Sequence, residues 1–317
     1  MALSREYRIR ELYLKYFEEN FSRERIREFD SVLNESEIRL LKRLSRVIDQ
    51  EDGTRNRAIF NAYLYSLFEV YTRHRKRISS LKELNRFSHH YVYDTEHDYV
   101  TNRPRIIQAL THCKLWELQD EEEANQLVAS ITLFQEFLNS LQNIALIEFS
   151  TSLKKFVTNK VSALLEEGPY NERVRLYGQL IQTPTREIAS HIETVRLALQ
   201  CMPVGDQKSA NIFLYIIVKV FKFWPEASTR LLHVPSDNDL SRVIFRIGMT
   251  QKKLGNLEYG TIGYAAMQTL AKRLIPENPS ALYGLKHISK VWCRSRSTEC
   301  DQCPMNSICA YAQSVLV

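Results

Sequence analysis

The chain has 317 residues, 44% of them hydrophobic and 25% charged, a composition that suits a globular protein with a substantial core and about two domains. No apolar run approaches the ~20 residues of a membrane-spanning helix, so we expect no membrane-embedded part. The formal net charge of +6 is mild, and its distribution along the chain is more informative than its sum.

The first residues are charged and have helical periodicity, which is not the pattern of a signal peptide. We therefore expect an intracellular, reducing location, which would be the cytoplasm or nucleoid if the source is a bacterium or archaeon. Clustered cysteines in such a location bind metal more often than they form disulfides.

Residues 1 to about 110 place apolar side chains three and four positions apart, which predicts helices. Residues 87–104 break this pattern and are interpreted as a loop or linker. The segment is rich in histidine and acidic residues, but no pair has confident helical i, i+4 spacing, so a metal site there is the less favoured interpretation.

Helical periodicity resumes at about residue 122 and continues to about residue 200, with predicted turns at 168–173 and 183–187. Residues 236–249 and 259–275 have the same periodicity. We find no convincing alternating strand and no internal repeat. The sequence therefore predicts an all-α protein.

Positive charge is concentrated in two stretches that contain no acidic residue, at 240–257 and 286–296, and in a shorter basic run at 73–77. Uncompensated positive stretches suit a phosphate backbone. The alternative is a basic face that is simply solvated.

Four of the six cysteines lie within 17 residues, with the spacing C-x6-C-x2-C-x5-C: Cys293, Cys300, Cys303 and Cys309. Four thiolates close together in sequence can bind a tetrahedral zinc ion or an iron–sulfur cube. Zinc sites usually contain two C-x2-C pairs, and only one pair is that close here. The spacing favours a [4Fe–4S] cluster, with zinc as the alternative.

This cysteine spacing resembles the cluster loop of the endonuclease III family, within the helix-hairpin-helix DNA glycosylases. The resemblance implies a bound [4Fe–4S] cluster, double-stranded DNA as the partner, and phosphate contacts from Arg294 and Arg296 in the first loop. Arg242 and Lys290, in the two basic stretches, are further candidates for DNA contacts.

Two upstream segments resemble other motifs of the same family. Residues 202–214 (MPVGDQKSANIFL) are similar to its hairpin, roughly L-P-G-V-G-x-K-T-A-N, with Lys208 at the lysine. Residues 235–249 (PSDNDLSRVIFRIGM) resemble its P-V-D-x-H-x-x-R-V stretch, with Asp237 at the aspartate. The hairpin implies that the backbone at Val204, Gly205 and Gln207 approaches a DNA phosphate.

The resemblance also implies a reaction. A base flipped out of the duplex is removed when the hairpin lysine attacks C1′ of the sugar, and the resulting Schiff base permits β-elimination. Lys208 would be this nucleophile, and Asp237 would stabilise positive charge that develops on the sugar. The alternatives are that Lys208 is an exposed lysine at a helix start and that Asp237 is a helix N-cap.

The chain departs from the family pattern at the hairpin, where Val204-Gly205-Asp206 replaces G-V-G. Asp206 puts a negative side chain near the expected phosphate. The separation between Lys208 and Asp237 is also longer than is usual for the family, so residues 219–234 are expected to loop out. Asp239 stands at the position of the family's histidine.

These observations predict an all-α, two-domain helix-hairpin-helix DNA glycosylase-like fold with an iron–sulfur cluster loop and an additional N-terminal helical region. Residues 1–110 would be that extension, without an assigned role and open to a protein partner. Residues 111–235 would form a helical barrel domain with the hairpin, and residues 236–317 the cluster domain. The expected function is a monomeric DNA glycosylase/AP lyase. The alternatives are a non-catalytic iron–sulfur DNA-binding module and a zinc-containing interaction protein with no nucleic-acid role.

Overall fold

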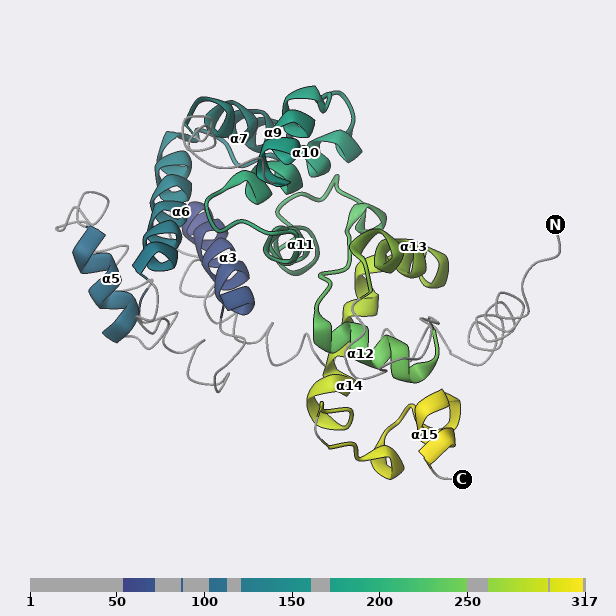
Figure 1. The fold of residues 1–317 in the computed structure, drawn as a ribbon. Helices are drawn as coiled ribbons and strands as arrows, with labels where there is room; N and C mark the ends of the chain where they lie inside the picture. The colour runs from purple at the N-terminus through teal and green to yellow at the C-terminus, as the bar shows by residue number, and fades with distance from the viewer. Residues whose placement is uncertain are drawn as a thin grey trace. The chain divides into compact units, whose positions relative to one another are not determined.

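The computed structural model describes residues 54–71, 87, 103–112, 121–160, 172–249, 262–295 and 297–315. Every regular element in these residues is a helix, and strand-type pairing is limited to an isolated bridge between Cys293 and Thr298 (Figure 1). The all-α prediction is therefore confirmed for this part of the chain. The basic run at 73–77, most of the loop at 87–104, and Arg296 lie outside the described residues.

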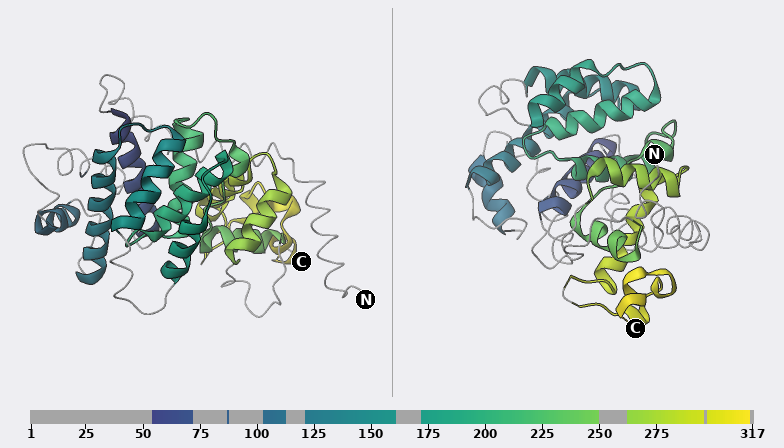
Figure 2. Two further views of the ribbon diagram at one scale, coloured as in Figure 1. Left: turned by 90° about the horizontal axis from the view of Figure 1, so that it is seen from above. Right: turned by 45° about the vertical axis from the view of Figure 1, so that its right-hand side comes forward.

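The described residues divide into two compact units, one within Leu40–Leu231 and the other within Leu232–Val317. The first contains the long helices α3 (Thr54–Tyr71), α5 (Arg103–His112), α6 (Glu121–Ser140), α7 (Leu146–Lys160), α9 (Glu172–Gln182), α10 (Ile188–Cys201) and α11 (Gln207–Leu214) (Figures 1 and 2). The turn predicted at 183–187 separates α9 from α10, as expected.

Helix α3 belongs to the core of this first unit, although the sequence analysis assigned residues 1–110 to a separate extension. It packs against α6 and α11. The ring of Tyr63 stacks on Phe134 at 3.8 Å between centroids, and its hydroxyl lies 2.7 Å from the hydroxyl of Ser130. Because nearly every described side chain from Ala58 to Phe68 is buried, α3 needs these partners to cover its surface.

The segment expected to loop out begins as a continuation of α11. A π-helix, Tyr215–Val220, follows α11 directly, and an irregular stretch then leads to a short 3-10 helix, Thr229–Leu231. Trp224 anchors this stretch to the segment before α7, because its ring is fully buried and its indole N–H donates to the carbonyl of Ile144 at 2.7 Å. The extra residues are therefore packed on the first unit rather than extended into solvent.

The second unit contains α12 (Asn238–Ile247), α13 (Tyr264–Leu274), a 3-10 helix at Pro279–Leu285, α14 (Lys286–Val291) and α15 (Ala310–Val315). Helix α12 packs on α14, α15 and the 3-10 helix, with Val243, Ile244, Leu282 and Met305 in the shared core. None of the helices described here is long and apolar enough to cross a membrane.

Candidate functional site

In the segment where the hairpin was predicted, two helices are joined by a tight turn. Helix α10 ends at Cys201, α11 begins at Gln207, and the two pack against each other. The turn is closed by a hydrogen bond from the Gly205 N–H to the carbonyl of Met202 at 2.9 Å. Arg196 of α10 also links the two helices, because its Nε donates to the side-chain carbonyl of Asn211 in α11 at 2.8 Å.

Gly205 is required by the space available in this turn. A Cβ at this position would lie 1.9 Å from the carbonyl oxygen of Leu199 in α10. Backbone atoms cannot move aside as a flexible side chain can, so any other residue would force the turn away from α10. A glycine at position 205 is therefore a steric requirement of this turn.

Asp206 caps the N-terminus of α11. Its carboxylate accepts the Ser209 N–H at 2.6 Å, and the Ser209 hydroxyl lies 3.1 Å from the Asp206 backbone nitrogen, which completes a capping box. A helix N-terminus is a natural site for a phosphate. Here the protein's own carboxylate accepts one of the backbone N–H groups that such an anion would use.

Lys208 lies in the first turn of α11 and is only 5% exposed. The interpretation of Lys208 as an exposed lysine at a helix start is therefore wrong. Gly205, Asp206 and Gln207 are partly exposed, whereas the side chain of Val204 is buried. The part of the hairpin that faces solvent is thus the short run just before Lys208.

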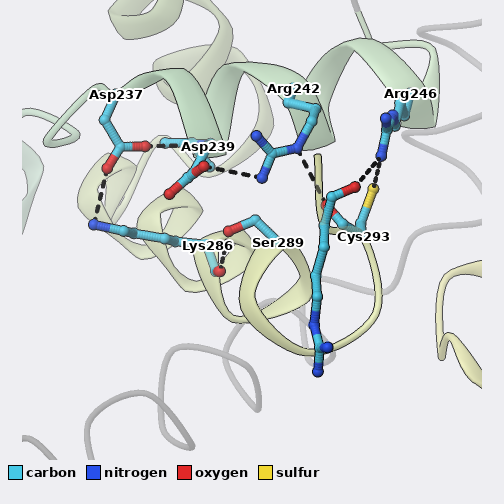
Figure 3. A network of polar contacts seen from close by, with 9 residues as sticks. Asp237, Asp239, Arg242, Arg246, Lys286, Ser289 and Cys293 are labelled. Atoms are coloured by element: carbon cyan, nitrogen blue, oxygen red, sulfur yellow. Dashed lines mark hydrogen bonds and ion pairs between the residues drawn. The ribbon is translucent and has the colours of Figure 1, made fainter. Parts of the chain in front are cut away.

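Asp237 is the N-cap of α12, as the alternative interpretation proposed. One carboxylate oxygen accepts the Leu240 N–H at 2.8 Å, and the other lies 2.8 Å from the ammonium nitrogen of Lys286 in α14 (Figure 3). The two side chains are 5% and 1% exposed, so this is a buried ion pair. Gln268 of α13 holds the segment that leads into Asp237. Its side-chain oxygen accepts the Val234 N–H, and its side-chain nitrogen donates to the Val234 carbonyl.

Arg242 is directed into the protein. Its guanidinium donates to the carboxylate of Asp239 at 2.9 Å and to the backbone carbonyl of Cys293 at 3.2 Å (Figure 3). The side chain is 10% exposed, so a phosphate contact would require the ion pair with Asp239 to open. Asp239, at the family's histidine position, thereby compensates a charge that appeared uncompensated in the sequence.

The two basic stretches are thus largely internal in the described part of the chain. Lys286 is paired with Asp237, Arg242 with Asp239, and Arg246 is 3% exposed. Arg294 is exposed. Lys290 lies on α14, but its side chain is not among those described, and neither is Arg296.

The four predicted cysteines line one small cavity, which leaves about 20 Å³ for the centre of a water-sized molecule. Cys293 lies two residues after α14, and Cys300 begins the 3-10 turn Cys300–Gln302. Cys303 directly follows that turn, and Cys309 directly follows the next 3-10 turn, Asn306–Ile308. Apolar side chains, among them Val243, Ile288 and Met305, form much of the remaining wall. In the described part of the chain, no group of three or more His, Cys, Asp or Glu side chains is arranged to hold a single metal ion.

The cavity disfavours free thiolates. Burial raises the pKa of the Cys303 thiol to about 11, a backbone hydrogen bond at Met305 opposes this, and the neighbouring Cys309, Cys293 and Cys300 raise it further. Burial likewise raises the pKa of Cys309. Because the four groups repel one another when ionised, a positively charged metal or iron–sulfur core would be needed to hold them as thiolates.

Arg246 provides a further test of what this cavity could hold. Its guanidinium donates to the sulfur of Cys293 at 3.3 Å (Figure 3). It also donates to the carbonyl of Arg294 at 3.0 Å and lies over the ring of Tyr311. Its Nε is buried and has no hydrogen-bond partner among the described residues. A buried guanidinium beside four cysteines fits an anionic thiolate-bound group, so the residues present are compatible with a [4Fe–4S] cluster.

Sequence reasoning missed the roles of Lys286 and Arg246, which it treated only as members of basic stretches. Their partners are 49 and 47 residues away, so no local spacing indicated either contact. The amphipathic pattern of α12 could have indicated that Arg246 is buried, because Arg246 follows Val243 by three positions and therefore lies on the same, apolar face of the helix.

Scans of protein-family models, curated proteins and solved structures found no match to this chain.

Proposed function

We propose that this protein is a DNA glycosylase/AP lyase of helix-hairpin-helix type that removes a damaged or modified base from double-stranded DNA. Lys208 is the proposed nucleophile, and Asp237 is proposed to stabilise the sugar as the base leaves. Cys293, Cys300, Cys303 and Cys309 are proposed to hold a [4Fe–4S] cluster, with zinc as the alternative.

The observation that carries the proposal is the hairpin. Lys208 lies in the first turn of α11, next to a partly exposed turn whose glycine cannot carry a side chain. Attack on carbon requires the neutral form of a lysine amine. Lys208 is proposed to supply that amine at the edge of the turn.

The arrangement of the cysteines supports the cofactor proposal. Four side chains spread along 17 residues line one cavity, and a buried arginine contacts the first of them. A bound cluster would supply structural support rather than bond-breaking chemistry. The chain's own contribution would be to hold Arg294 at the surface of the loop, where a phosphate could be reached.

The proposed reaction replaces the base with the Lys208 amine and then cleaves the strand. The Lys208 amine forms a bond to C1′ of the deoxyribose while the bond from C1′ to the base nitrogen breaks, and the base leaves with the electron pair and takes up a proton. Loss of the amine proton and opening of the sugar ring give an imine. Removal of a C2′ proton then expels the 3′ phosphate, which cuts the strand.

Borohydride reduction of the imine tests this proposal directly. The wild-type protein is incubated with a duplex that contains one abasic site, beside Lys208→Met and the control Lys219→Met in the following π-helix. We expect a covalent protein–DNA adduct with the wild type and the control and none with Lys208→Met, with folding of all three checked by circular dichroism. An undiminished adduct with a folded Lys208→Met protein would refute the assignment of the nucleophile.

A second candidate function is a non-catalytic iron–sulfur DNA-binding module. The buried ion pair between Asp237 and Lys286 favours it, because the carboxylate is already engaged by the protein. Asp206 favours it as well, because its carboxylate competes with a phosphate at the start of α11. A folded wild-type protein that binds abasic DNA and gives no adduct would favour this candidate over lyase chemistry.

A further inference from the structure

We propose that Lys286 is a positioning residue for Asp237, which it keeps ionised and fixed at the N-terminus of α12. This inference rests on the proposed function, because it assigns Lys286 a role in the reaction through Asp237. Lys286 itself is 1% exposed and is not proposed to contact DNA.

The geometry holds the Asp237 carboxylate from two directions. Leu240 N–H binds one oxygen at 2.8 Å, and the Lys286 ammonium lies 2.8 Å from the other (Figure 3). The ammonium is itself held, since it donates to the hydroxyl of Tyr283 at 3.0 Å and lies 5.1 Å from the centre of that ring. The carboxylate therefore has little freedom to rotate.

The burial of the pair makes the lysine necessary for the charge of the aspartate. A carboxyl group removed from water takes up a proton unless a positive charge or hydrogen-bond donors compensate it. Lys286 places a cation beside Asp237, whereas Arg242, on the next turn of α12, is paired with Asp239.

The proposed reaction needs this charge. Asp237 can stabilise positive charge on the sugar only as a carboxylate, and each carboxylate oxygen has two lone pairs with which to accept contacts. A hydrogen bond to one lone pair of each oxygen thus does not by itself prevent the carboxylate from facing the sugar. Lys286 would then be needed for the rate of the reaction and not for the affinity for DNA.

The test compares Lys286→Met, which removes the charge, with Lys286→Gln, which keeps a hydrogen-bond donor, and Lys286→Arg, which keeps the charge. Lys272→Met is the control, because Lys272 is exposed on α13 in the same unit. The rate of borohydride trapping is measured with protein in excess over an abasic duplex. The Kd is measured separately with a duplex that carries a non-reactive tetrahydrofuran abasic analogue.

We expect at least a tenfold lower trapping rate in Lys286→Met and Lys286→Gln, with Kd within threefold of wild type. We expect Lys286→Arg to recover a rate within threefold of wild type, and Lys272→Met to be unchanged. Circular dichroism and visible absorbance establish that each variant is folded. If Lys286→Met does not fold, the trapping rate and the Kd of Lys286→Gln are compared with those of the wild type.

Trapping at the wild-type rate by a folded Lys286→Met or Lys286→Gln protein would overturn the inference and leave the pair as a structural link between α12 and α14. A parallel loss of rate and affinity in both neutral variants, with loss of helical signal, would overturn it too. If the wild-type protein traps no DNA, the proposed function and the role of Lys286 both fail. If the wild type traps DNA and the neutral variants trap it equally fast, only the role of Lys286 fails.

Discussion

Replacement of Gly205 by alanine tests the close contact on which the hairpin depends. The added Cβ would lie 1.9 Å from the carbonyl oxygen of Leu199, 3.0 Å from its carbonyl carbon and 3.1 Å from the Cα of Gln200. Because real Cβ contacts essentially never fall below 3.0 Å, the turn and α10 must separate by about 1 Å. The atoms that clash belong to the backbone, so no side-chain rotation can relieve the contact.

The expected cost is large for a single methyl group. Overpacking of this kind costs about 1–3 kcal/mol and occasionally more, and the absence of a flexible partner puts Gly205→Ala at about 2–4 kcal/mol. In a unit of this size each kcal/mol lowers Tm by about 2–4 °C. We therefore expect Tm to fall by about 5–15 °C, measured by circular dichroism at 222 nm.

The control is Gly178→Ala, in the interior of α9. Nothing lies within 4 Å of a Cβ built at Gly178, so this change adds the helix preference of alanine without a clash. It should raise the free energy of unfolding by about 0.5–1 kcal/mol. A Gly205→Ala protein with a Tm within 2 °C of wild type would refute the close approach of the turn to α10.

Asp206→Gly should tighten binding to duplex DNA at low salt and make that binding more dependent on salt, because it removes a carboxylate from the start of α11. The cost to the stability of the helix is only a few tenths of a kcal/mol. Anisotropy titrations at several salt concentrations would check the change in affinity. Cys303→Ser should abolish iron binding and the associated brown colour, as metal analysis and absorbance would reveal, and full iron occupancy in this variant would count against a four-cysteine centre. Burial raises the pKa of Cys201 from 9.0 to about 12, so the folded state keeps its proton longer than the unfolded state, and stability should fall as pH rises from about 9 to 12. The Cys201→Ala protein should therefore lose less stability over this pH range. Urea unfolding would measure the free energy of unfolding at each pH, and a pH dependence equal to that of wild type would contradict this prediction.

Local features of this protein could be predicted from the sequence because neighbouring residues produce them. The helical periodicities gave the all-α class, and residues 183–187 were correctly predicted as the turn between two helices. Asp237, followed by Asn238 and Asp239, was a candidate N-cap for the same reason, since capping involves only the next three residues. The cysteine spacing brought four side chains into one segment, and they line one cavity.

The compensation of charge was decided by the tertiary structure. Lys286 and Arg246 appeared to belong to exposed basic stretches, yet one is paired with Asp237 and the other contacts Cys293. The burial of Lys208 and the place of α3 in the first unit were likewise unpredictable, because each depends on helices distant in sequence. Periodicity shows which face of a helix is apolar, but only packing determines what that face covers and which charges are removed from water.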